Sequence, residues 1–169
     1  NYKKIMDHLL KVQSCALIGT GRVGADFLHS LLDSHTEILT FSGTFSFHEF
    51  WRDSHCANSP NINLDDLLDE FLGKHIEKFK SRYDWKEGKD RLGKNKDESI
   101  DIDLLHYKKL TKSLLIDRTI NSRNVLLAIY GAWALYLGQN IDKKKILFHQ
   151  IHHAQHLNNY LNDFIISTL

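Results

Sequence analysis

A glycine-rich turn between an apolar run and a helical pattern is the feature that most constrains this chain. Residues 19–24 are Gly-Thr-Gly-Arg-Val-Gly. The apolar residues 15–18 before them predict a buried strand, and residues 24–34 predict a helix. Glycines allow positive φ and close approach of the backbone to a ligand, and the helix start adds about half a positive charge. We therefore expect residues 14–33 to bind a phosphate-bearing ligand.

The remaining elements predict strands that alternate with helices. In the helix after the turn, the apolar side chains at helical spacing are expected to face the preceding strand; they are Phe27, Leu28, Leu31 and Leu32. Further strands are expected at residues 38–41, 146–148 and 164–169. Further helices are expected at residues 1–11, 45–54, 64–79, 102–116 and 122–137. Asn63, and either Asn121 or Ser122, could cap two of these helices, and Gly138 ends the last one. This order indicates one α/β domain over residues 1–169 with a parallel sheet.

Composition narrows the class of protein. The chain has 169 residues, of which 42% are hydrophobic and 25% charged, as in a soluble globular domain. Its 22 basic and 21 acidic residues nearly cancel, so no nucleic-acid partner is expected. The uncharged residues 124–141 contain an apolar part shorter than the roughly 20 residues of a membrane span, which predicts a buried helix. Cys15 is expected to be buried, and cytoplasm is the default location. Residues 86–97 are expected to form a solvated loop.

Two common glycine-rich motifs, the dinucleotide fingerprint and the Walker A loop, each match only part of this turn. The dinucleotide fingerprint G-x-G-x-x-G matches, but it also expects an acid at the end of the second strand, and Glu37 lies at the other end. An NAD(P)-dependent oxidoreductase remains an alternative. A Walker A loop needs Gly-Lys-Ser/Thr, whereas Gly24 is followed by Ala25 and Asp26. An ordinary ATPase or GTPase is therefore not expected.

Residues 18–39 resemble the start of sulfotransferases that use 3′-phosphoadenylyl sulfate, with a loop like those of bacterial and tyrosylprotein members. Those enzymes begin with a strand, a basic residue, Ser-Gly-Thr or a variant, and a helix that ends Leu-Leu-Asp-x-His-Pro. The matching positions here are Arg22, Gly24, Leu31, Leu32, Asp33 and His35. The resemblance implies a P-loop-type sulfotransferase architecture. It also implies transfer of a sulfuryl group to a hydroxyl or amine of a small-molecule, glycan or peptide acceptor.

The same resemblance assigns roles within the turn. Arg22 holds and polarises the phosphosulfate, and Phe27 matches an aromatic residue that stacks on adenine. The backbone amides of the loop and of the first helical turn cradle the phosphate. The implied cofactor-binding residues are Gly21, Arg22, Val23, Gly24, Ala25, Asp26 and Phe27. Val23 and Ala25 stand where the family has serine and threonine, so the backbone carries the expected cradle.

A histidine-rich stretch has three interpretations. His149, His152, His153 and His156 lie within eight residues. They could meet a metal on one helix face, but no carboxylate or cysteine joins them, and no metal is expected. They could also be surface histidines. By the resemblance, a histidine at the carboxyl end of a central strand is the general base, for which His149 is the first choice and His152 the second. Glu49 is a further candidate.

The last residues of the chain are compared with the strand that precedes the 3′-phosphate site in the family. In the family, a further strand leads to an Arg-x-Pro-Arg motif and a serine that hold the 3′-phosphate of the donor. Residues 163–169 are expected to form that strand, which places the 3′-phosphate site beyond residue 169. The non-enzymatic alternative is a degenerate interaction domain that binds a partner through residues 124–137. Self-association is left open.

Overall fold

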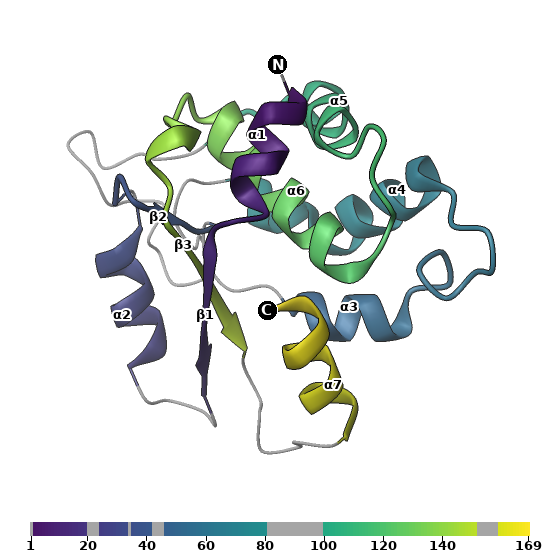
Figure 1. Ribbon diagram of the computed structural model, residues 1–169, viewed down its shortest axis with the longest axis horizontal. Helices are drawn as coiled ribbons and strands as arrows, with labels where there is room; N and C mark the ends of the chain where they lie inside the picture. Colours follow the sequence, from purple (N-terminus) through teal and green to yellow (C-terminus); the bar gives the residue numbers. More distant parts are fainter. Residues whose placement is uncertain (1, 20–23, 34, 42–45, 81–99, 152–158) are drawn as a thin grey trace.

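The computed structural model describes residues 2–19, 24–33, 35–41, 46–80, 100–151 and 159–169. Within these residues the chain forms an α/β structure, in which a parallel sheet of three strands is flanked by seven α-helices (Figure 1). The strands are β1 (Gln13–Ile18), β2 (Ile38–Leu39) and β3 (Ile146–Ile151), and β3 lies between the other two. The expected α/β class with a parallel sheet is confirmed.

The carboxyl ends of β1 and β3 lie level with each other. Ile18, the last residue of β1, is opposite Ile151, the last residue of β3. The backbone N–H of Gly19 continues this pairing by donating to the carbonyl of Ile151 at 3.0 Å. β2 is shorter and pairs with the first two residues of β3. The chain therefore leaves β1 and β3 at the same edge of the sheet.

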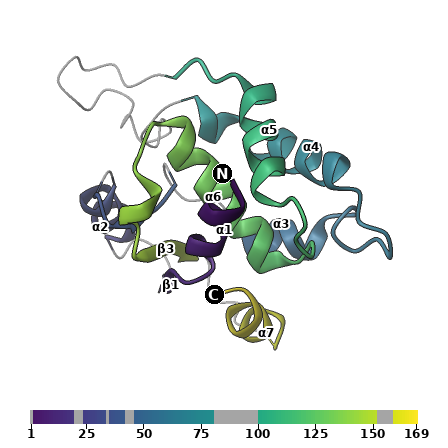
Figure 2. The ribbon, with the colours of Figure 1, turned by 45° about the horizontal axis from the view of Figure 1, so that its top comes forward.

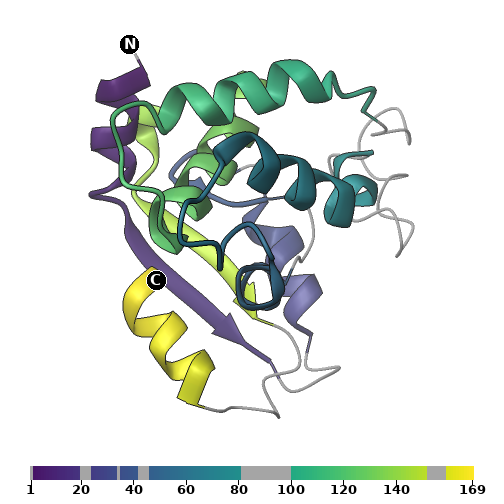
Figure 3. The same ribbon diagram turned by 90° about the vertical axis from the view of Figure 1, so that its right-hand side faces the viewer.

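Helices cover the two faces of this sheet unequally. Figure 1 shows α2 on one face, and Figure 2 shows α6 and then α4 and α5 beyond the other face. Figure 3 looks onto this second side and shows α7 at its lower edge, below α5 and α4. The bounds are α1 (Tyr2–Leu9), α2 (Ala25–Leu32), α3 (Phe47–Asp53), α4 (Leu64–His75), α5 (Leu104–Leu114), α6 (Ser122–Tyr136) and α7 (Asn159–Thr168), with the 3-10 helices η1 (Ile76–Phe79) and η4 (Ile141–Lys143). None of the described helices is long and apolar enough to span a bilayer.

The helical side holds the main hydrophobic core, and α6 is its centre. Eleven of the 15 residues of α6 are buried, which confirms the predicted buried helix. The Trp133 ring lies 4.7 Å from the ring of Phe41 and 5.7 Å from that of Phe79, measured between centroids. A Cβ at Gly131 would lie 2.5 Å from Cδ1 of Leu9, so glycine lets α1 approach α6 closely. Burial of several aromatic side chains makes this layer the main source of stability.

The start of α4 and both ends of α6 lie where their capping residues predicted them. The side chain of Asn63 accepts a hydrogen bond from the N–H of Asp65 at the start of α4, as expected of a cap. Asn121, and not Ser122, caps α6 by accepting from the N–H of Asn124 at 2.8 Å. Gly138 follows α6 with a φ of +68°, a conformation that favours glycine.

The last predicted strand is wrong, because residues 164–168 belong to helix α7, which ends at Thr168. Leu161, Phe164 and Thr168 are buried at helical spacing, whereas Ile166 is 84% exposed. Phe164 packs on the ring of Phe47 in α3, with the centroids 6.1 Å apart. The end of α7 is held by α6. The side chain of Arg123 donates to the carbonyls of the last two residues, each at 3.1 Å. These contacts with distant segments favour a helix over a strand.

β1 is an outer strand of the described sheet and not the buried strand expected. Cys15 is exposed, which corrects the prediction that it is buried, and Ile18 is 44% exposed. The helix after the turn forms as predicted, but its apolar side chains do not all face the sheet. Phe27 is 69% exposed and Leu31 62% exposed, whereas His29 on the same helix is buried. A polar side chain therefore takes the sheet-facing position that the apolar spacing assigned to hydrophobic residues.

Candidate functional site

The glycine turn ends in a left-handed residue at the start of α2. Gly24 has φ +77° and ψ +14°, a backbone conformation that residues other than glycine rarely adopt. Its carbonyl accepts the first helical hydrogen bond, from the N–H of Leu28 at 3.0 Å. Gly24 has no side chain that could accept from the N–H groups of the first helical turn, so these groups are not capped by the residue at the N-cap position. Figure 1 shows the start of α2 at the same end of the sheet as the carboxyl ends of β1 and β3.

The structure brings together only part of the predicted cofactor-binding set. Gly24, Ala25 and Phe27 lie at the start of α2, and Asp26 contributes backbone to the same turn. Phe27 is exposed, so its ring is accessible to a planar ligand. The predictions for three residues of the turn and for one histidine fall outside the described residues; these are Gly21, Arg22, Val23 and His152.

His149 lies inside β3 and not at its end. The strand continues to Ile151, two residues beyond His149, which corrects the predicted boundary at residue 148. The imidazole is 1% exposed, and its Nδ1 shares a hydrogen bond of 2.8 Å with the hydroxyl of Tyr130 on α6. Burial lowers the pKa of His149 to about 3, and the nearby His48 and His29 act in the same direction. A general base works best with a pKa near the working pH, so this environment does not favour proton acceptance near neutrality.

His48 and Glu49 lie together on α3. His48 is 7% exposed and its ring packs 6.0 Å from that of Phe164, centroid to centroid. Burial lowers the pKa of His48. Glu49 stands at the accessible side of the same helix, with its carboxylate 4.0 Å from Nε2 of His48. Of these two groups, Glu49 is the one that solvent can reach.

A buried polar cluster was missed by the sequence prediction. Nδ1 of His29 lies 3.0 Å from the side-chain Oε1 of Gln150, and Nε2 lies 2.8 Å from the carbonyl oxygen of Phe41. The hydroxyl of Thr40 is also 2.8 Å from Nε2. The one sequence signal was the histidine itself, a polar residue within the apolar helical pattern. Its partners are 11 to 121 residues away in sequence, so the pattern could not identify them.

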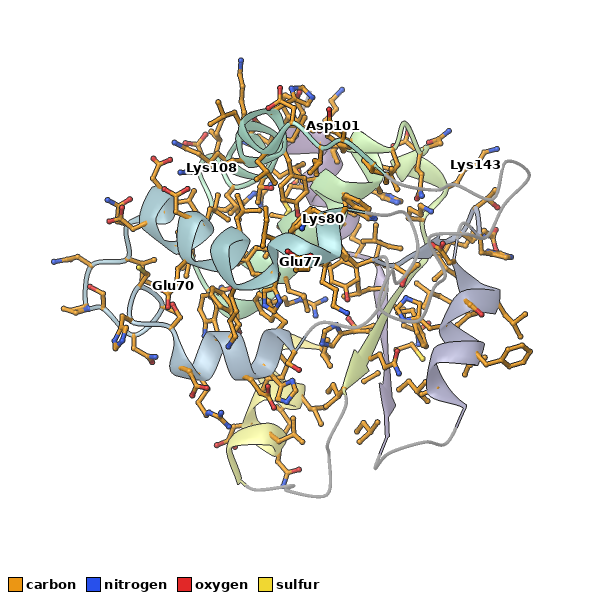
Figure 4. The ribbon with its side chains drawn as sticks, turned by 180° about the vertical axis from the view of Figure 1, so that it is seen from behind. Glu70, Glu77, Lys80, Asp101, Lys108 and Lys143 are labelled. Atoms are coloured by element: carbon orange, nitrogen blue, oxygen red, sulfur yellow. The ribbon has the colours of Figure 1, made fainter. Side chains whose placement is uncertain are left out.

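A groove of about 560 Å³ lies between α4 and α5, away from the glycine turn. Leu105 and Ile116 contribute apolar lining, and Lys108, on the α4 side of α5 (Figure 4), contributes charge. The ammonium group of Lys108 lies 3.1 Å from the carboxylate of Asp65 and 2.7 Å from that of Asp69. The groove contains none of the predicted site residues, and its ion pairs join the two helices. We therefore place the candidate site at the glycine turn.

Metal ligation finds no support among the described residues. Within them, no group of three or more His, Cys, Asp or Glu side chains is arranged to hold a metal ion. The later histidines of the cluster lie outside the described residues; they are His152, His153 and His156.

Comparisons with protein-family models, with curated proteins and with solved structures found no match for this chain.

Proposed function

We propose that the chain carries the phosphosulfate-binding part of a sulfotransferase, which transfers a sulfuryl group from 3′-phosphoadenylyl sulfate to a hydroxyl or amine. The observation that carries this proposal is left-handed Gly24 at the start of α2, next to the level ends of β1 and β3. Open parallel sheets bind ligands at the carboxyl ends of their strands. The uncapped N–H groups at the start of α2 suit an anionic phosphate.

The strand order favours this proposal over a nicotinamide-dependent oxidoreductase. In the dinucleotide-binding fold with strand order 3-2-1-4-5-6, the second strand pairs directly with the first. Here β3 lies between β1 and β2. The order of the three described strands therefore differs from that of the dinucleotide-binding fold.

The bound donor would supply the sulfuryl group and leave as adenosine 3′,5′-bisphosphate. In the proposal, Arg22 and the N–H groups at the start of α2 stabilise the negative charge of the phosphosulfate and position it for in-line transfer. The exposed ring of Phe27 stacks on adenine. Because His149 is buried with a lowered pKa, we assign proton acceptance to His152, with Glu49 as the other candidate. His149 then supports the central strand through Tyr130.

Two glycines provide a matched test of the site. Gly24 and Gly138 both have positive φ, and among the described residues, chain neighbours aside, a Cβ at either would have no atom within 4 Å. Alanine therefore strains the backbone at both positions without a steric clash, by about 1 kcal/mol. We expect Gly24→Ala to weaken binding of adenosine 3′,5′-bisphosphate about tenfold or more, as measured by calorimetry, and Gly138→Ala to leave it unchanged. Equal affinities in the two variants would remove the turn from the binding site.

A thermal-shift panel separates the alternatives. Adenosine 3′,5′-bisphosphate should raise the melting temperature of the unmodified chain, and NAD(H) should not. Stabilisation by NAD(H) alone would favour the oxidoreductase. If neither nucleotide stabilised the chain and it associated with itself, a degenerate interaction domain would be the better interpretation.

A further inference from the structure

We infer that His29 is a positioning residue that holds α2, and with it the N–H groups at the start of this helix, against the carboxyl ends of β2 and β3. The ligand part of this inference rests on the proposed function. The structural part rests only on the contacts of the ring. The resemblance of residues 18–39 to sulfotransferases assigned no role to His29.

The side chains of α2 show why this helix depends on His29. Three of its large apolar residues are exposed, with Phe27 69%, Leu31 62% and Leu28 40% exposed, and Leu32 is half-buried. Ala25 and His29 are the residues of α2 that are buried among those with described side chains. An alanine offers little contact area, so apolar burial contributes little to the attachment of this helix. The imidazole is therefore the main specific link between α2 and the sheet.

The ring joins three elements at once. A carbonyl oxygen can only accept, so Nε2 of His29 carries a proton and donates to the carbonyl of Phe41, just after β2. The hydroxyl of Thr40 lies beside the same nitrogen. Nδ1 bonds to the side-chain amide of Gln150 in β3, which can offer either an acceptor or a donor. The ring also packs edge-on against Phe148, with centroids 5.3 Å apart.

The position of these bonds links them to the site. Phe41 and Gln150 lie at or next to the points where the chain leaves β2 and β3. His29 is five residues after Gly24 in the same helix, so the bonds to its ring set where the first N–H groups of α2 stand relative to both strand ends. A shift of this helix would move the phosphate cradle without removing any group that touches the ligand. A displacement of about 1 Å is enough to weaken a preorganised site strongly.

The test compares two buried ring substitutions. His29→Phe keeps an aromatic ring beside Phe148 and removes both nitrogens. Tyr107→Phe removes a buried hydrogen bond of 2.9 Å to the carbonyl of Ile129 in the helical layer, and serves as the control for a general loss of stability. Both variants are measured well below their melting temperatures. The readouts are amide hydrogen exchange in α2 and calorimetric affinity for adenosine 3′,5′-bisphosphate.

We expect His29→Phe alone to accelerate exchange at the amides of α2 and to weaken nucleotide binding, each by about tenfold or more. Exchange rates in α2 and an affinity equal to those of Tyr107→Phe would overturn the inference. If His29→Phe does not fold, the variants Gln150→Leu and Thr40→Val test the positioning role of His29 in the same two assays. Each removes one partner of the ring, and each should produce a smaller change in the same direction. No change in either variant would overturn the inference.

Failure of this inference differs from failure of the proposed function. If the unmodified chain does not bind adenosine 3′,5′-bisphosphate, the proposed function fails, and hydrogen exchange in α2 still decides the role of His29. If the unmodified chain binds the nucleotide and His29→Phe binds it equally well with unchanged exchange, only the positioning role fails.

Discussion

The two faces of β3 are built by different physical means. On the α6 face, Trp133 and its aromatic neighbours are buried in a continuous core. On the α2 face, Phe27 and Leu31 are exposed, and a buried histidine provides the main link. The first face is stabilised by apolar burial and the second by directional hydrogen bonds. Elements that bind ligands are commonly drawn from the less stable parts of a fold, so the α2 face has the character expected of a site.

The largest effect should come from the core of the helical side. Trp133→Ala removes a ring that contacts Phe41, Phe79 and Tyr107. We expect the free energy of unfolding to fall by about 3–5 kcal/mol, as is typical when a large buried aromatic side chain is lost. Urea denaturation measures this change. A loss below about 1 kcal/mol would mean that the helical layer is not the stabilising core.

The buried histidines make stability depend on pH. Burial lowers the pKa of His149 to about 3 and that of His75 to about 4, both below the unfolded value of 6.5. The unfolded chain therefore binds protons that the folded chain does not, and stability falls as the pH drops below 6.5. Between pH 6.5 and 5 each imidazole should lower the free energy of unfolding by about 2 kcal/mol.

Denaturation curves across this pH range measure the slope, and His149→Gln should make it shallower. If His149→Gln showed the same dependence of unfolding free energy on pH as the unmodified chain, His149 would not be a source of that dependence. His75→Gln provides the second measurement, because His75 lies on α4 and away from the sheet.

Helix capping should give a smaller effect on the helical side. Asn121→Ala removes the side-chain oxygen that accepts from the N–H of Asn124, and should lower stability by about 1 kcal/mol. Asn63→Ala is the matched variant at the start of α4 and should behave alike. Neither change should alter nucleotide affinity, because both caps lie away from the glycine turn. A loss of nucleotide affinity in either variant would contradict the separation of core and site.

The smallest effect on stability should come from the α2 face. Phe27→Ala removes a ring that is 69% exposed and should change stability by less than about 0.5 kcal/mol. If the ring stacks on adenine, the same change should weaken nucleotide binding by about 1–3 kcal/mol. Ile166→Ala, at a residue 84% exposed on α7, is the control and should change neither quantity. Equal affinities in the two variants would remove Phe27 from the site.

The sequence predicted what local signals determine. The extent of α6 follows from its continuous apolar run, and its start follows from the Asn121 cap. The start of α2 follows from the glycine turn, since Gly24 permits the left-handed backbone there. These features depend on residues within a few positions of each other. They therefore could be predicted without knowledge of the tertiary structure.

Features set by distant contacts could not be predicted in this way. Phe164 lies in a helix because it packs on α3, more than 100 residues earlier in the chain. β3 continues past His149 because Gln150 and Ile151 pair with Leu17 and Ile18 of β1, more than 100 residues earlier in the chain. Phe27 is exposed because His29, two residues later in the same helix, takes the position that faces the sheet. The candidate site at the glycine turn stays a prediction, whereas the contacts that hold α2 on the sheet were visible only in the structure.

The central claim is that the glycine turn binds the phosphosulfate end of a nucleotide. Calorimetric titration of adenosine 3′,5′-bisphosphate into the unmodified chain and into Arg22→Ala tests it most directly. The account predicts binding to the unmodified chain and an affinity about tenfold or more lower in the variant, because a charged contact to phosphate is lost. An unchanged affinity in Arg22→Ala would contradict it.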